Sequence, residues 1–115
     1  GVVMPRPRKP RFVDGPPIVD RFRPHPFHSK GKEEVFLPIE GLEAIRLRDY
    51  EGLSQEEAAE RMNVSRQTFG RILTHARKTV AETLVLGRVL RIEGGHFEMP
   101  SRGCRRRRRG RGGRL

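Results

Sequence analysis

Three side chains that can read nucleic-acid bases lie close together in the middle of this sequence. They are Arg66, Gln67 and Arg71. Arginine can donate two hydrogen bonds to a guanine edge, and glutamine can exchange two with an adenine edge. On the first turns of a helix, such side chains would reach into the major groove of DNA. This chemistry requires a helix that its neighbours hold rigidly.

The segment from Gln55 to Ile72 has the pattern of a helix-turn-helix. Asn63 stands at the turn, where the backbone is expected to be left-handed. Ala59 falls where the two helices would cross closely. Capping signals precede both helices, Ser54 before the first and Ser65 before the second. The apolar residues recur at spacings that direct them to a shared core: Ala58, Met62, Val64, Phe69 and Ile72.

Further elements flank this pair of helices. We expect a supporting helix from Pro38 to about Tyr50, the pair at 54–62 and 65–86, and short strands at 34–37 and 88–92. The two strands could pair with each other, although the sequence alone does not decide this. The third helix carries a long apolar stripe, whose second half should pack elsewhere: Phe69, Ile72, Leu73, Ala76, Val80 and Leu84.

The fold class expected is therefore mainly α, a tri-helical helix-turn-helix domain with short flanking strands. A chain of 115 residues has room for one such small domain. We assign it to residues 33–97. A basic, Pro-rich arm at 1–32 and an Arg/Gly-rich tail at 98–115 flank it, and both should be largely irregular.

Charge is distributed unevenly along the chain. Residues 1–32 carry a net charge of +6 and residues 101–115 a net charge of +8, whereas residues 33–100 carry −3. Within this middle part, residues 33–60 hold nine acids and two arginines, but residues 61–91 hold seven bases and one acid. The positive face thus begins at the expected recognition helix, which favours attraction to phosphates.

Several classes of function have no support in the sequence. Cys104 is the only cysteine, which excludes an intrachain disulfide and a multi-cysteine zinc site. His25 and His28 have no further ligands near them, and we interpret them as loop histidines. No catalytic constellation, cofactor motif or long apolar run is present. We expect no enzyme activity, metal, cofactor or membrane contact, and a cytoplasmic, nucleoid-associated location.

The expected DNA contacts fall into three sets. The base contacts are Arg66, Gln67, Gly70 and Arg71. The phosphate contacts are Ser54, Gln55, Ser65, Thr68, Thr74, His75, Arg77 and Lys78. The basic arms would add nonspecific affinity through Arg6, Arg8, Lys9, Arg11, Arg105, Arg106, Arg107, Arg108 and Arg109. Gly70 has two explanations, close approach of DNA or a tight helix crossing, since glycine inside a helix is otherwise unfavourable.

Three segments together resemble a known family. They are LEAIRLRDYEGLSQEEAAERMNVSRQTFGRIL (Leu42–Leu73), RIEGG (Arg91–Gly95) and MPRPRKPR (Met4–Arg11). They are similar to a prokaryotic family of small uncharacterised proteins predicted to bind DNA. Its helix-turn-helix resembles the fourth region of bacterial sigma factors, which implies major-groove binding. The chain departs from the family pattern at Asp14, near which a cysteine often stands, and at Pro38, which replaces a helix-capping threonine.

These observations together favour a sequence-specific DNA-binding protein, a transcriptional regulator whose helix at 65–86 reads double-stranded DNA. A homodimer reading paired half-sites is compatible with this interpretation. Two alternatives stay open at this point. The Arg-rich tail suits an RNA-associated protein, and the tri-helical unit suits a module that docks onto RNA polymerase.

Overall fold

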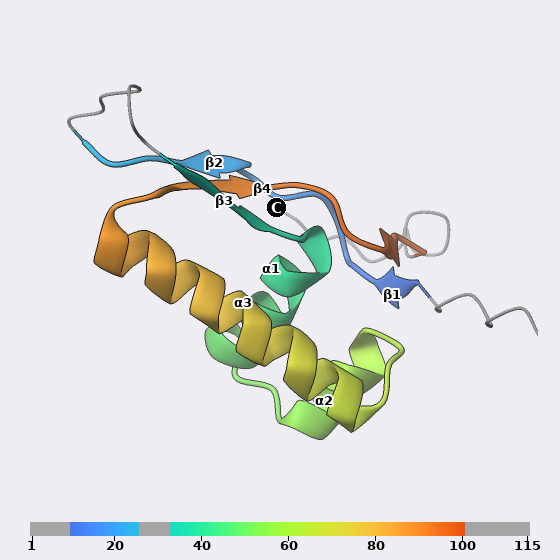
Figure 1. Cartoon of the computed structure of the whole chain (residues 1–115). Helices are drawn as coiled ribbons and strands as arrows, with labels where there is room; N and C mark the ends of the chain where they lie inside the picture. The colour runs from blue at the N-terminus through green and yellow to red at the C-terminus, as the bar shows by residue number, and fades with distance from the viewer. Residues whose placement is uncertain (1–9, 26–32, 101–115) are drawn as a thin grey trace, which may run out of the picture.

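Three helices form the body of the molecule and a small sheet covers one end of it (Figure 1). The computed structural model describes residues 10–25 and 33–100. Helix α1 (Ile39–Ile45) continues into a π-helical turn, η1 (Arg46–Tyr50), and is followed by α2 (Gln55–Arg61) and the long α3 (Arg66–Leu86). The mainly α, tri-helical prediction is confirmed.

Local signals set the ends of α2 and α3 as the sequence predicted. The Ser54 side chain accepts a hydrogen bond from the Glu57 N–H, and the Glu57 carboxylate accepts one from the Ser54 N–H, completing a capping box. Ser65 caps α3 by accepting from the Thr68 N–H at 3.0 Å. Between the helices Asn63 has a φ of 60°, the left-handed turn that was expected.

The core of the helix-turn-helix lies where the three helices meet. Phe69 and Leu73 of α3 pack against Ala58 and Met62 around α2 and Leu47 of η1. Phe69, Met62, Ala58 and Leu47 are completely buried. Val64 and Ile72 are half-buried at the edge of this cluster. The spacing of apolar residues therefore predicted this core correctly.

The main sheet has three strands in the order β2 (Arg21–Phe22), β4 (Val89–Ile92), β3 (Glu34–Leu37). Strand β4 pairs in parallel with β3, from Glu34 opposite Val89 to Leu37 opposite Ile92, and antiparallel with β2. The two strands that the sequence predicted thus pair with each other. A second, two-stranded sheet joins β1 (Arg11–Phe12) in parallel with β5 (Phe97–Glu98).

The second half of α3 packs against the three-stranded sheet. Ala76 and Val80 contact Leu37, Leu90 and Ile92 in a second apolar cluster. Helix α1 crosses α3 closely at Gly41, where an added Cβ would lie 3.3 Å from the Cβ of Ala76. Our prediction that Leu84 continues the buried stripe is wrong. Leu84 is 76% exposed, because the sheet covers α3 only as far as the turn that contains Val80.

Residues 10–25 are largely irregular, as expected, but their two short strands fix them to the domain. The Phe12 N–H donates to the Met62 carbonyl at the end of α2, at 2.9 Å. An ion-pair cluster adds a second attachment, since Asp14 pairs with Arg46 at 2.6 Å and with Arg61 at 3.0 Å. Glu43, which is buried, also pairs with Arg46, and the pKa of Arg46 is raised as a result.

Asn63 provides a test of the turn that sets the angle between α2 and α3. A β-branched residue in a left-handed conformation costs more than asparagine, on the order of 1–2 kcal/mol. We expect Asn63→Val to lower the free energy of unfolding by about this amount, and Asn63→Gly to leave it nearly unchanged. Urea unfolding monitored by circular dichroism measures both. Equal destabilisation by valine and glycine would show that the left-handed backbone is not the constraint.

Candidate nucleic-acid interface

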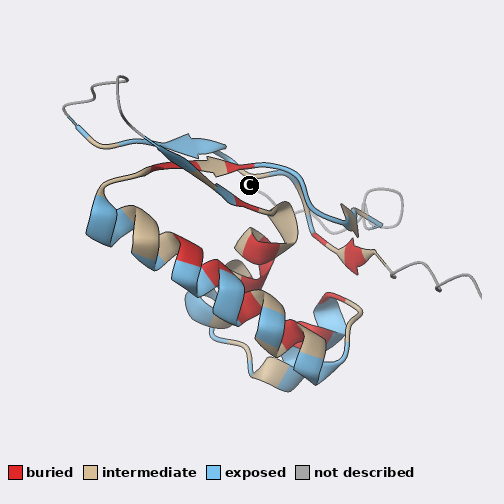
Figure 2. Cartoon of the chain, in the orientation of Figure 1, coloured by how far each residue is buried: buried red, intermediate tan, exposed pale blue. Residues whose placement is uncertain are grey.

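The outward face of α3 presents the side chains that the sequence assigned to DNA. In Figure 2 buried and exposed residues alternate along α3, because one side of the helix faces the core. Arg66, Gln67, Arg71 and Thr74 are all exposed, while Phe69 on the other side is completely buried. A shallow hollow on the exposed side is lined by Gln67, Gly70, Arg71, Thr74, His75 and Lys78. The structure therefore brings six of the twelve expected base and phosphate contacts together around this hollow.

Gly70 lies in the middle of this surface without any packing reason for a glycine. A Cβ added there would meet only the Oε1 atom of Gln55, at 3.9 Å, which is ordinary van der Waals distance. The tight helix crossing offered above as one explanation is therefore wrong, because α2 and α3 leave room for a side chain at this position. A close helix crossing is found instead at Gly41, between α1 and α3, where an added Cβ would lie 2.9 Å from Leu37 Cδ1 and 3.3 Å from Ala76 Cβ.

Two expected phosphate contacts have structural roles within the fold. The hydroxyl groups of Ser54 and Ser65 accept hydrogen bonds from backbone N–H groups as helix caps. Gln55 begins α2 beside Gly70 and is half-buried. Thr68, half-buried in the first turn of α3, receives hydrogen bonds from the Ser65 hydroxyl at 3.1 Å and from Arg71 at 3.5 Å.

The basic side chains of α3 differ in how firmly ion pairs hold them. Arg66 pairs with Glu56 at 3.2 Å, but both side chains are largely exposed, so the pair can exchange for another partner at little cost. Arg77 is held more firmly by two hydrogen bonds to Asp49, at 2.5 and 3.1 Å. These bonds lower the pKa of Asp49 and raise that of Arg77. Within the described ranges, Arg71 and Lys78 form no ion pair.

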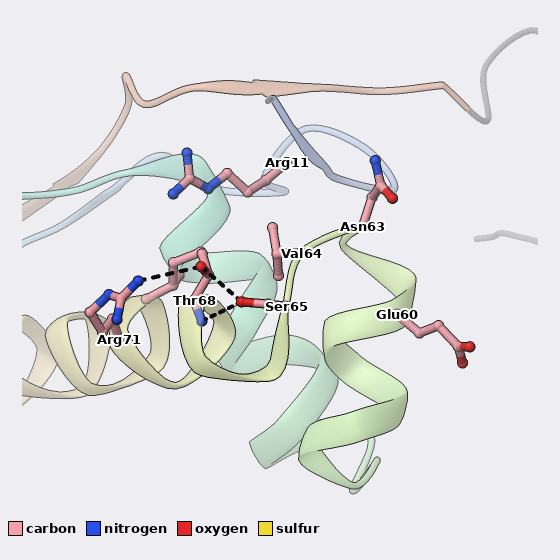
Figure 3. Close-up of a pocket in the computed structure, with 8 residues that line it drawn as sticks. Arg11, Glu60, Asn63, Val64, Ser65, Thr68 and Arg71 are labelled. Atoms are coloured by element: carbon pink, nitrogen blue, oxygen red, sulfur yellow. Dashed lines mark hydrogen bonds between the residues drawn. The ribbon is translucent and has the colours of Figure 1, made fainter. Parts of the chain in front are cut away.

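Arg11 is the functional candidate whose position the sequence did not indicate. We expected it in a basic arm, but it lies in β1 and is only 8% exposed. It lines a hollow of about 600 Å³ together with residues of the turn and the first part of α3, among them Thr68 and Arg71 (Figure 3). No local signal could have revealed this, because β1 pairs with β5, far away in the sequence.

The remaining predicted contacts lie outside the described residues. These are Arg6, Arg8, Lys9 and Arg105–Arg109. His28, interpreted as a loop histidine, and Cys104 also lie outside the described residues. His25 is described and exposed. No helix in the described ranges is long and apolar enough to cross a membrane.

Comparison with known proteins places the chain in a family. A family model described as "Protein of unknown function DUF134" matches residues 3–100. The chain belongs to the DUF134 family. This confirms the resemblance to an uncharacterised prokaryotic family that the sequence segments indicated. The match includes the whole helix-turn-helix and both sheets, so the candidate interface lies inside the region that defines DUF134.

Several relatives in this family carry the name UPF0251. The UPF0251 protein TTE1845 of Caldanaerobacter subterraneus is 51% identical over 96 residues, which cover 84% of this chain and 81% of the relative. A UPF0251 protein of Desulforudis audaxviator is 50% identical over 107 residues, covering 89% of this chain and 70% of the relative. No solved structure shows a significant match.

The pair between Arg77 and Asp49 predicts a small, pH-dependent contribution to stability. Because Arg77 lowers the pKa of Asp49, the pair stabilises the fold above the pKa of an unfolded aspartate, about 3.9. This contribution disappears as the pH falls through the lower pKa of the folded state. We expect Asp49→Asn to lower the free energy of unfolding at neutral pH by about 0.2–1 kcal/mol, since the pair is exposed.

Urea unfolding from neutral pH down to about pH 3 measures this difference. The difference in free energy of unfolding between Asp49→Asn and the parent should become smaller at the acidic end of the range. Asp49→Asn in a chain that also carries Arg77→Gln serves as the matched control and should show no such trend, because the hydrogen-bond partner of Asp49 is absent. If this difference in free energy of unfolding stays constant over the whole pH range, titration of Asp49 is not its cause.

Proposed function

We propose that this protein binds double-stranded DNA in a sequence-specific manner and acts as a transcriptional regulator. In this proposal α3 lies in the major groove and α2 lies across its entrance. Arg66 and Gln67, in the first turn of α3, read base edges, and Lys78 and Thr74 contact the flanking backbone. The site of action would be the nucleoid, in the cytoplasm.

The observation that carries this proposal is the exposed face of α3. It belongs to a helix whose opposite face is anchored in the core, so the exposed side chains project from a rigid support. The face combines amide and guanidinium groups that can bond base edges with a glycine that leaves space at its centre. Basic residues predominate along it, which suits a polyanionic partner.

Replacing the two base-reading side chains separates recognition from general affinity. We expect Arg66→Ala or Gln67→Ala to reduce discrimination between preferred and random duplexes by about 1–3 kcal/mol, because one bidentate contact is lost. Selection from a random DNA pool identifies the preferred duplex, and titrations with that duplex and a scrambled one measure discrimination. Unchanged discrimination in both variants would contradict the assignment of α3 as the reading helix.

Two further variants serve as comparisons in this experiment. Arg21→Ala removes the same charge as Arg66→Ala from the exposed strand β2, at the opposite end of the molecule from the start of α3 (Figure 1), and should retain discrimination. Deletion of residues 101–115 removes eight arginines and should weaken binding to both duplexes alike. Tighter binding of the parent to structured RNA than to any duplex would favour an RNA-associated role instead.

Gly70 allows stability and DNA binding to be changed in opposite directions. Because the fold leaves room for a methyl group, Gly70→Ala should raise the free energy of unfolding by about 1 kcal/mol through helix propensity. The same methyl group would project toward the bound DNA and should weaken binding about tenfold, which corresponds to about 1.4 kcal/mol. Thermal unfolding and duplex titration measure the two effects.

A matched substitution distinguishes this outcome from a general effect on α3. Ala81→Gly places a glycine at an exposed position of the same helix, away from the candidate interface, and should lower stability without changing DNA affinity. If Gly70→Ala binds DNA as tightly as the parent, the DNA does not approach α3 at this residue.

A further inference from the structure

A hollow beside the start of α3 is lined by a buried arginine, Arg11, two of whose guanidinium nitrogens have no hydrogen-bond partner among the described residues. The hollow has a volume of about 600 Å³ and lies between β1 and the first two turns of α3. Arg11 lines it from β1, and Ser65, Thr68 and Arg71 line it from α3. In Figure 3 the Arg11 side chain extends from its strand across the start of α3, on the side where Thr68 and Arg71 lie.

The Arg11 guanidinium is buried without the hydrogen bonds that a buried cation normally has. Within residues 10–25 and 33–100, no acceptor bonds its Nε and Nη1 atoms and no carboxylate pairs with it. Arg48 and Arg88 also have an Nε without a hydrogen bond, but both have other partners. Arg48 donates through Nη1 to the Leu53 carbonyl, and Arg88 pairs with Glu33 at 3.2 Å and with Glu82 at 4.0 Å. Arg11 differs from these two arginines because two of its buried nitrogens lack an acceptor in the described part of the chain, so its guanidinium can donate hydrogen bonds to an anion.

The backbone holds Arg11 firmly in this position. Its own N–H donates to the His96 carbonyl at 3.2 Å, and the next two residues donate to the carbonyls of Met62 and Glu98, both at 2.9 Å. The hydrogen bond from Phe12 ends at Met62, the last residue before the turn of the helix-turn-helix. The arginine is therefore fixed relative to α3, and binding an anion would need little ordering of the chain.

The opposite wall of the hollow supplies further groups suited to an anion. The one hydrogen bond recorded for the Arg71 side chain among the described residues is long, 3.5 Å to the Thr68 hydroxyl oxygen. The Thr68 hydroxyl lies 3.1 Å from the Ser65 hydroxyl, and because its hydrogen can rotate it can also donate to a bound anion. The N-terminal end of a long helix adds positive potential. Glu60 also lines the hollow, but Figure 3 shows its carboxylate directed away from both guanidinium groups.

We propose that Arg11, Arg71 and Thr68 form a binding site for a phosphate group. Two guanidinium groups match the charge and the oxygen geometry of a tetrahedral phosphate, and the Thr68 hydroxyl can donate to a third oxygen. The phosphate belongs either to the DNA backbone beside the groove that α3 enters, which rests on the proposed function, or to a free phosphorylated molecule. In both cases Arg71 contacts a phosphate and not a base.

Nitrogen–proton correlation spectra of the full chain test the site directly, with inorganic phosphate as the probe and no DNA. We expect saturable shifts of the Arg11 and Arg71 Nε–H signals and of the Thr68 amide. Arg11→Met, which keeps the buried volume but removes the charge, should abolish them. Arg71→Gln is the second variant, because Arg71 is exposed and its replacement leaves the fold intact. Arg61→Met is the matched control. It removes an arginine that pairs with Asp14 and does not line the hollow, and it should retain the shifts.

Addition of the selected DNA duplex identifies the source of the phosphate. If the backbone fills the site, the duplex shifts the same signals and displaces inorganic phosphate. Arg71→Gln then lowers the slope of log affinity against log salt by about 0.9, with base preference unchanged. If a free phosphorylated molecule fills it, inorganic phosphate still binds in the presence of the duplex. Failure of both phosphate and duplex to shift the Arg11 and Arg71 signals would overturn the proposal.

These outcomes are independent of the proposed function. Shifts with inorganic phosphate, but no selection of any duplex, would support the phosphate site and refute sequence-specific DNA binding. Duplex selection that depends on Arg66 and Gln67, without any response of the Arg11 and Arg71 signals to phosphate or duplex, would support DNA reading and refute the phosphate site.

Discussion

The burial of Phe69 is the constraint on which the rest of the structure depends. This side chain enters a core built from η1, α2 and α3, and it is completely covered. With one position of α3 fixed in this way, the helical repeat determines the direction of every neighbouring residue. Leu73 and Ala76 continue inward, and Gln67, Gly70 and Thr74 must face solvent. The candidate interface is thus a geometric consequence of the core.

The parts of the fold that depend on local signals could be predicted from the sequence. The capping serines, the left-handed Asn63 and the apolar spacing from Ala58 to Ile72 each act within a few residues, and all were confirmed. The strands at 34–37 and 89–92 were also located, but their pairing depends on contacts between distant segments. Leu84 was assigned wrongly because periodicity shows which side of a helix is apolar, not how far the sheet extends over it.

The candidate site was predictable to a similar extent. The exposed face of α3 followed from the same periodicity as the core, so Arg66, Gln67 and Arg71 were placed correctly on it. Whether Gly70 fills a tight crossing could be settled only from the positions of two helices in space. Arg77 and its partner Asp49 are separated by 28 residues, and nothing in their spacing indicates an ion pair. The burial of Arg11 depends on pairing with a strand near the other end of the domain.

The central position of β4 has a consequence for the order in which the chain can fold. Strands β2 and β3 both pair with β4 and not with each other, although both precede it in the sequence. During synthesis they emerge from the ribosome without their neighbour and acquire it only when residues 89–92 follow. The three helices can associate earlier, because their contacts are closer in sequence. The sheet can then close last, over the part of α3 that contains Ala76 and Val80.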